Sequence, residues 1–279
     1  MKTLITPVMV EAMRRLRFLL FPAAFFFGSL AQAQTVVVAY FTDGATSSTA
    51  PAAAITRNNY TAQQITNLAT FDFSSNKVLV INEPSNSGYS TALTDQTSTL
   101  ATFVQNGGLL IFHDRFVNGT PPLPSSLLPG ASGITFVRSE AKNIDVTFSS
   151  FISNGTYGTL TNTSLDEGNQ SEHRYAVRST LPAGAVVYLS YGSDTSKAVG
   201  FAYKFGTGTV YYSTIPLDYY LSGNSPAAFA DIYYPNLLAG ISQLRAVPEP
   251  SVVGLLLSGI CGLGLLRKFR AGKQLIRRP

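Results

Sequence analysis

Residues 35–41 read TVVVAYF, a continuous run of apolar and β-branched side chains. A run of this kind is typical of a strand that is buried on both faces, as in a parallel sheet. Two similar runs follow along the chain, KVLVI at 77–81 and LLIF at 109–112. This part of the sequence therefore predicts three buried strands.

Helical segments separate these runs. Residues 51–68 have helical length and are rich in Ala and Gln, and residues 93–104 carry apolar side chains near helical spacing. Asn106-Gly107-Gly108 is a typical helix end. Alternating strands and helices, joined by right-handed crossovers, build a parallel sheet covered by helices.

The pattern changes after a proline-rich loop at 119–130. Short strand candidates follow, namely GITFV, IDVTF, RYAVRS and AVVYLSY. Residues 198–215 predict two strands in a tight hairpin through Gly206 and Gly208. Residues 226–244 have the length and apolar stripe of a terminal helix. We therefore expect added antiparallel strands beside the parallel sheet.

The net charge of +5 is concentrated at the two ends of the chain. Residues 34–247 contain 10 Lys and Arg against 13 Asp and Glu, a net charge of −3. Nucleic-acid binding requires clustered cations, so we expect no nucleic-acid partner. The single cysteine, Cys261, lies in a C-terminal apolar run, which leaves the middle of the chain without a Cys nucleophile or an internal disulfide.

The N-terminal segment has the order of a secretory signal. Three arginines within 14–17 precede an apolar run at 18–30 and then the small-residue motif AQAQ. This order predicts a signal peptide over 1–33 that is cleaved after Ala33. An anchor helix is the alternative, but thirteen residues interrupted by Pro22 are short for a membrane span.

Three ordered elements stand at the C-terminal end. They are VPEP (Val247, Pro248, Glu249 and Pro250), an apolar, glycine-rich run at 251–266, and the basic motif RKFR with Arg267, Lys268 and Arg270. A helix over the apolar run would be roughly 20 Å long, which makes it a minimal single transmembrane helix. The basic cluster favours the cytoplasmic side, which places the preceding domain outside the cytoplasm.

Together these elements, over residues 247–273, resemble the PEP-CTERM sorting signal. The resemblance implies recognition by an exosortase, a membrane-embedded transpeptidase-like protease of Gram-negative bacteria that build extracellular polysaccharide. It also implies transient anchoring in the inner membrane, processing near VPEP and transfer to the cell surface or matrix. A plain tail anchor remains the alternative.

The segments FVQNGGLLIFHDR at 103–115 and FGTGTVYYSTIPLDYYL at 205–221, with the order of elements, resemble the class I glutamine amidotransferase-like superfamily, notably its ThuA-like branch. The resemblance implies a flavodoxin-like, three-layer α/β domain over residues 34–246. In amidotransferases a Cys follows the third strand, where this chain has His113 and Asp114. Amidotransferase chemistry is therefore not expected, because a thioester requires a thiolate.

Ionisable side chains follow the three predicted strands. Asp43 follows the first strand, Glu83 the second, and His113 with Asp114 the third. Ligands bind at the carboxyl edge of open parallel sheets. One hypothesis is therefore hydrolysis with His113 as the base and Asp114 or Glu83 orienting it, with Asp43 and Asp218 binding the ligand. The competing interpretation is ordinary strand-end and turn chemistry, because no fixed-spacing catalytic or metal motif is present.

Tyrosines offer a second kind of site. Tyr211, Tyr212, Tyr219, Tyr220, Tyr233 and Tyr234 fall within one stretch. Exposed rings of this kind would stack on sugars, but buried tyrosine is common and core packing is the favoured interpretation.

These observations favour an exported cell-surface or matrix protein with a non-catalytic binding domain. The alternatives are an envelope hydrolase acting on carbohydrate through His113 and the strand-end carboxylates, and a purely structural matrix protein. The expected partners are an exosortase, the inner membrane and exopolysaccharide. We expect no cofactor and assign no metal ligands.

Overall fold

The structure is a computed structural model that describes residues 36–45, 47–115 and 123–247. The predicted signal peptide lies outside these ranges. So does the predicted sorting signal beyond Val247, including the expected transmembrane segment 251–266. Within the described ranges, no helix has both the length and the apolar character that a membrane crossing requires.

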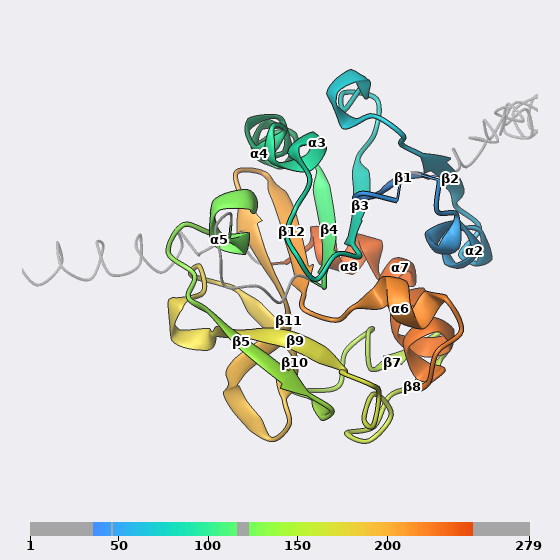
Figure 1. Ribbon diagram of the computed structural model, residues 1–279, viewed down its shortest axis with the longest axis vertical. Helices are drawn as coiled ribbons and strands as arrows, with labels where there is room; N and C mark the ends of the chain where they lie inside the picture. Colours follow the sequence, from blue (N-terminus) through green and yellow to red (C-terminus); the bar gives the residue numbers. More distant parts are fainter. Residues whose placement is uncertain (1–35, 46, 116–122, 248–279) are drawn as a thin grey trace, which may run out of the picture. The chain divides into compact units, whose positions relative to one another are not determined.

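The three apolar runs form the centre of a ten-stranded mixed sheet (Figure 1). They are β1 (Val37–Thr42), β3 (Val78–Glu83) and β4 (Leu109–Asp114). β2 (Thr61–Gln64) and β12 (Gly208–Ser213) extend this parallel part, which runs in the order β2, β1, β3, β4, β12. The predicted parallel arrangement of the three buried strands is confirmed.

Antiparallel strands continue the sheet beyond β12. β11 (Asp194–Phe205), β10 (Val186–Tyr191) and β6 (Ile144–Val146) follow in that order, and β9 (Glu172–Val177) joins β11 to β5 (Phe136–Ala141). The predicted hairpin at 198–215 is confirmed as the β11–β12 pair. A separate ribbon contains β7 (Asn154–Gly155) and β8 (Gly158–Thr159).

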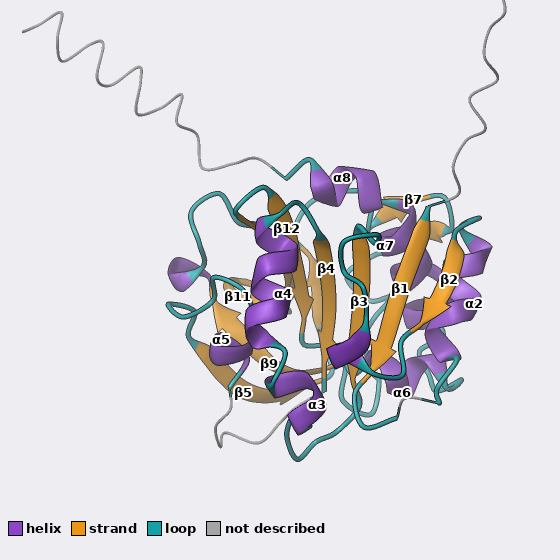
Figure 2. Ribbon diagram, turned by 90° about the horizontal axis from the view of Figure 1, so that it is seen from above, coloured by secondary structure: helices purple, strands orange, loops and turns teal. Residues whose placement is uncertain are grey.

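Helices cover both faces of the parallel part, and each face has its own apolar core (Figure 2). One core contains side chains of α3 (Thr91–Thr94) and α4 (Thr97–Gln105). The other contains side chains of α2 (Ala50–Arg57), α6 (Leu217–Leu221), α7 (Tyr234–Ala239) and α8 (Ile241–Arg245). Short elements complete the description: η2 (Leu68–Thr70), α5 (Pro124–Leu127), η3 (Arg178–Thr180) and the π-helical turn η4 (Phe229–Tyr233).

The predicted helix over 51–68 is wrong in its second half. α2 ends at Arg57, and Asn59 adopts a left-handed conformation with φ of 59°. Asparagine tolerates this conformation better than most residues, so it turns the chain back toward the sheet. Residues 61–64 then pair with β1 as an edge strand.

The predicted helix over 226–244 is divided into shorter pieces. The chain passes from η4 into α7 and then, at Gly240, into α8. A Cβ at Gly240 would lie 1.9 Å from Cδ2 of Phe151, so only glycine allows this close approach. The apolar stripe is nevertheless buried against the sheet, as its spacing predicts.

Candidate functional site

The ends of β3 and β4 bring four polar side chains to the carboxyl edge of the sheet. Asn82 pairs with His113 and Glu83 pairs with Asp114 in the register of the two strands. Successive side chains of a strand point to opposite faces. His113 therefore lies in one core, and Asp114 lies in the other together with Glu83. The expected pair of His113 with Asp114 or Glu83 is not formed, because strand alternation separates them.

His113 is enclosed by tyrosines. Its Nε2 lies 3.0 Å from the hydroxyl of Tyr233, and the rings of Tyr211 and Tyr234 pack against the imidazole. The side chain is 1% exposed, and burial lowers its pKa to about 3. The imidazole is thus neutral at pH 7. Its Nδ1 has no hydrogen-bond partner among the described residues.

Asp114 is held by tyrosine hydroxyls on the other face. Its Oδ2 accepts hydrogen bonds from Tyr89, at 2.7 Å, and from Tyr212, at 2.5 Å. Asp114 is fully buried, and its charge raises the pKa of both phenols, which burial already raises. The two tyrosines therefore remain protonated donors, and the contact ties β4 to β12 and to the loop that follows β3.

Asp43 and Glu83 are two further buried carboxyl groups at this edge. Asp43 accepts hydrogen bonds from the backbone and side chain of Ser90, the residue that caps α3, and Glu83 Oε1 accepts from the backbone of Ser85 at 2.6 Å. Burial raises the pKa of Glu83 to about 11, and Asp43 acts in the same direction. Glu83 is therefore protonated at pH 7.

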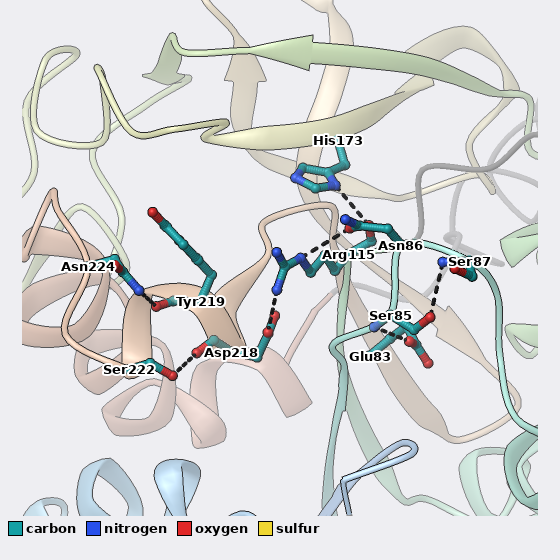
Figure 3. A network of polar contacts seen from close by, with 10 residues as sticks. All are labelled: Glu83, Ser85, Asn86, Ser87, Arg115, His173, Asp218, Tyr219, Ser222 and Asn224. Carbon is teal, nitrogen blue, oxygen red and sulfur yellow. Dashed lines mark hydrogen bonds and ion pairs between the residues drawn. The ribbon is translucent and has the colours of Figure 1, made fainter.

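Arg115 and Asp218 form a partly exposed network at the same edge (Figure 3). Arg115 Nη1 lies 2.9 Å from Asp218 Oδ2, and Arg115 Nε donates to Asn86 Oδ1 at 3.1 Å. The guanidinium lies 5.7 Å from the centre of the Tyr219 ring. Arg115 therefore pairs with a residue 103 positions away rather than with its neighbour Asp114.

His173 joins this network through the backbone of Arg115 (Figure 3). In the tautomer that satisfies both groups, its Nδ1–H donates to the backbone carbonyl of Arg115 at 2.8 Å. Burial lowers the pKa of His173 to about 4, so the ring is neutral at pH 7. Asp218 has a raised pKa because burial outweighs the nearby Arg115. The sequence identified Asp218 as a ligand candidate and placed Tyr219 in the tyrosine cluster, whereas it missed Asn86, for which no pattern in the chain gives a signal.

Five of the six clustered tyrosines are core residues. Tyr211, Tyr212, Tyr220, Tyr233 and Tyr234 are fully buried, and only Tyr219 is partly exposed. The favoured interpretation of core packing is confirmed for these five. They cannot stack on a sugar at the surface.

The described part of the chain contains no group of three or more His, Cys, Asp or Glu side chains arranged to hold a metal ion. The four strand-end side chains are divided between two cores, and the tyrosine and serine donors already use many of their lone pairs. The arrangement fits structural hydrogen bonding between strand ends and the elements that cover them.

No protein-family model and no curated protein matches this chain. Solved structures with a distant likeness include an exo-β-1,4-mannosidase from Opitutaceae bacterium strain TAV5, with 12% identity and a TM-score of 0.44 over 74% of this chain. A cytoplasmic protein from Salmonella typhimurium LT2 has 9% identity and a TM-score of 0.48 over 77% of this chain and 100% of its own. A glutamine amidotransferase from Thermotoga maritima has 10% identity and a TM-score of 0.37, over 76% of this chain and 94% of its own.

This chain spans only 36% of the length of the mannosidase. All three TM-scores lie below 0.5, so these likenesses transfer neither activity nor substrate. What the structure establishes is the class of fold, a mixed α/β domain with a parallel central part and added antiparallel strands.

Proposed function

We propose that this chain is an exported, exosortase-sorted protein of the cell surface or matrix, whose α/β domain binds exopolysaccharide without cleaving it. The order of the two terminal segments supports the export and sorting parts of the proposal. Residues 34–247 carry a net charge of −3, which is consistent with an envelope domain that does not bind nucleic acid. They also contain no Cys nucleophile, so amidotransferase chemistry is not part of the proposal.

The observation that carries the non-catalytic part is the enclosure of His113. A general base must come within hydrogen-bond reach of the substrate proton that it removes. His113 is 1% exposed, contacts tyrosines instead of a carboxylate, and has its pKa lowered to about 3. A base with this pKa has little driving force to take a proton at pH 7.

Sorting is tested by replacing Pro248, Glu249 and Pro250 with alanine in the host bacterium. The wild-type protein should lose its C-terminal segment and reach the surface, whereas the triple variant should stay intact in the inner membrane. Ser251→Ala is the matched control, because it lies next to the motif and leaves it unchanged. Identical processing of the wild type and the triple variant would contradict the sorting proposal.

An envelope hydrolase acting on carbohydrate is the second candidate function. The observation that favours it is Glu83, because a carboxyl group that stays protonated at pH 7 can serve as a general acid. Against it, Glu83 contacts Asp43, whereas glycosidase carboxyl groups stand about 5 Å or more apart to flank the sugar bond. Release of reducing ends that Glu83→Gln abolishes, in a variant that remains folded, would establish this alternative.

A further inference from the structure

A cleft of about 470 Å³ opens at the amino-terminal edge of the parallel strands, opposite the strand ends described above. It lies between the segment that enters β3, helix α4 and the turn that enters β4. Small-ligand sites typically have volumes of about 300–1,000 Å³. The cleft is therefore large enough for a sugar unit, and it shares no residue with the carboxyl edge.

Two aromatic rings form the apolar wall of this cleft. The rings of Phe73 and Phe103 have centroids 5.6 Å apart, and Phe71 supports Phe73 edge-on at 4.9 Å. A Cβ at Gly108 would lie 2.5 Å from Cζ of Phe103, so the bare glycine lets this ring lie against the backbone. Phe73 remains partly exposed toward the cleft. The wall is thus held in place by packing that exists without a ligand.

Polar side chains without partners surround the aromatic wall. Among residues 36–45, 47–115 and 123–247, no hydrogen-bond or ion-pair partner is found for the side chains of Lys77, Ser98 and Asn106. The neighbouring Thr102 is different, because its hydroxyl donates to the carbonyl of Ser98 at 2.9 Å. The cleft therefore offers an ammonium, a hydroxyl and an amide beside the partly exposed ring of Phe73, which the buried ring of Phe103 backs.

We propose that this cleft binds a pyranose unit of an acidic polysaccharide. The apolar C–H face of the sugar packs against Phe73, which Phe103 supports from behind, its hydroxyls meet Ser98 and Asn106, and its carboxylate faces Lys77. This inference rests on the proposed function: it names the cleft as the binding site and an acidic exopolysaccharide as the ligand. Lys77, Ser98 and Asn106 are exposed, so an apolar ligand would displace their water without replacing its hydrogen bonds, which makes a sugar acid the better match.

The test uses two probes that differ only at C6, a tetramer of β-1,4-linked mannuronate and β-1,4-mannotetraose. Each is titrated calorimetrically into the full chain in detergent micelles. The wild type should bind the mannuronate tetramer more tightly. Lys77→Gln should weaken mannuronate binding about threefold to fivefold, as expected for an exposed ion pair, and leave mannotetraose binding unchanged. Lys142→Gln, an exposed lysine outside the cleft, is the matched control.

Phe73→Ala should weaken binding of both probes about thirtyfold, the effect of removing a central aromatic contact. Thermal unfolding of each variant is measured in parallel, and Lys77→Gln keeps the test independent of packing because Lys77 is exposed. Failure of both probes to bind the wild type, or equal binding by the wild type and a folded Phe73→Ala variant, would overturn the inference. Release of reducing ends in the same samples is a separate outcome. It would overturn the proposal that the domain is non-catalytic, but it would not contradict sugar binding in the cleft.

Discussion

His113 Nε2 lies 3.0 Å from Tyr233 Oη, and this contact joins the end of β4 to the π-helical turn η4. The Tyr233 hydroxyl also lies 2.9 Å from the hydroxyl of Tyr211 on β12. All three side chains are buried, so each depends on the others to satisfy its polar atom. The relationship explains why a histidine at a strand end stabilises the fold without being accessible to substrate.

Tyr233→Phe should lower the free energy of unfolding by about 1–3 kcal/mol, because it leaves buried polar atoms of His113 and Tyr211 with fewer partners. Urea unfolding at pH 7 measures this loss. Tyr219→Phe is the control, since Tyr219 is partly exposed, and its effect should stay within about 0.5 kcal/mol. Equal effects of the two substitutions would show that the Tyr233 hydroxyl has no structural role.

His113 should make the protein less stable in acid. Its pKa is about 3 when folded and 6.5 in the unfolded reference, so the unfolded chain takes up a proton first as the pH falls below 6.5. The stability that His113 contributes is complete above pH 6.5 and is lost toward pH 3. The stability advantage of the wild type over His113→Gln should therefore shrink by about 2 kcal/mol between pH 7 and pH 5. The same advantage at both pH values would contradict the burial of a neutral imidazole.

Glu83 should make the protein less stable in alkali. Its pKa is about 11 when folded and 4.5 in the unfolded reference, so only the unfolded chain loses this proton between those values. Stability contributed by the protonated carboxyl group is complete below pH 4.5 and falls as the pH rises toward 11. Between pH 7 and pH 9 the wild type should lose about 1 kcal/mol per pH unit from this group.

Glu83→Gln should flatten this alkaline slope, which urea unfolding at pH 7, 8 and 9 measures directly. Glu140→Gln is the matched control, because Glu140 is more exposed and Arg138 lowers its pKa, so it does not titrate in this range. A slope that persists unchanged in Glu83→Gln would mean that Glu83 is ionised in the folded protein.

The ion pair of Arg115 with Asp218 should couple measurably. Their side chains are 26% and 19% exposed, so solvent screens the pair only in part. A double-mutant cycle with Arg115→Gln and Asp218→Asn should give a coupling free energy of about 1 kcal/mol. The more exposed Arg138–Glu140 pair is the comparison and should couple by less than about 0.5 kcal/mol. A smaller coupling for Arg115 and Asp218 than for the exposed pair would contradict the network at the carboxyl edge.

Gly240→Ala should destabilise the junction of α7 and α8 by about 1–3 kcal/mol through overpacking. The added methyl group would overlap the ring of Phe151, which lies in the core that α8 covers. Gly133→Ala serves as the control, because no heavy atom lies within 4 Å of the position that its Cβ would take. Thermal unfolding compares the two variants, and similar melting temperatures would argue against the close contact.

The parallel part of the fold could be predicted because its strands are continuous apolar runs. Residues 37–42, 78–83 and 109–114 are buried almost throughout, so composition alone identifies them. β2 could not be predicted in this way, since TAQQ has no apolar run and becomes a strand only by pairing with β1. Its conformation is decided by the left-handed turn at Asn59 and by tertiary pairing.

The candidate site could likewise be predicted only in part. The sequence correctly places Glu83, His113 and Asp114 at one edge of the sheet, but the predicted pair of His113 with Asp114 is wrong, because strand alternation turns the two side chains to opposite faces. It does not reveal that each face is filled with tyrosines, because Tyr89 and Tyr233 come from distant segments. The pairing of Arg115 with Asp218 likewise depends on where α6 lies relative to the residue that follows β4, which no local pattern encodes.

The most direct test of the central claim is a binding and cleavage measurement on the same sample. The full chain is incubated at pH 7 with exopolysaccharide from its own host, and bound protein and newly formed reducing ends are both measured. The account predicts saturable binding with no reducing ends above the protein-free background. Reducing ends that form with the wild type and disappear in a folded His113→Gln variant would contradict it.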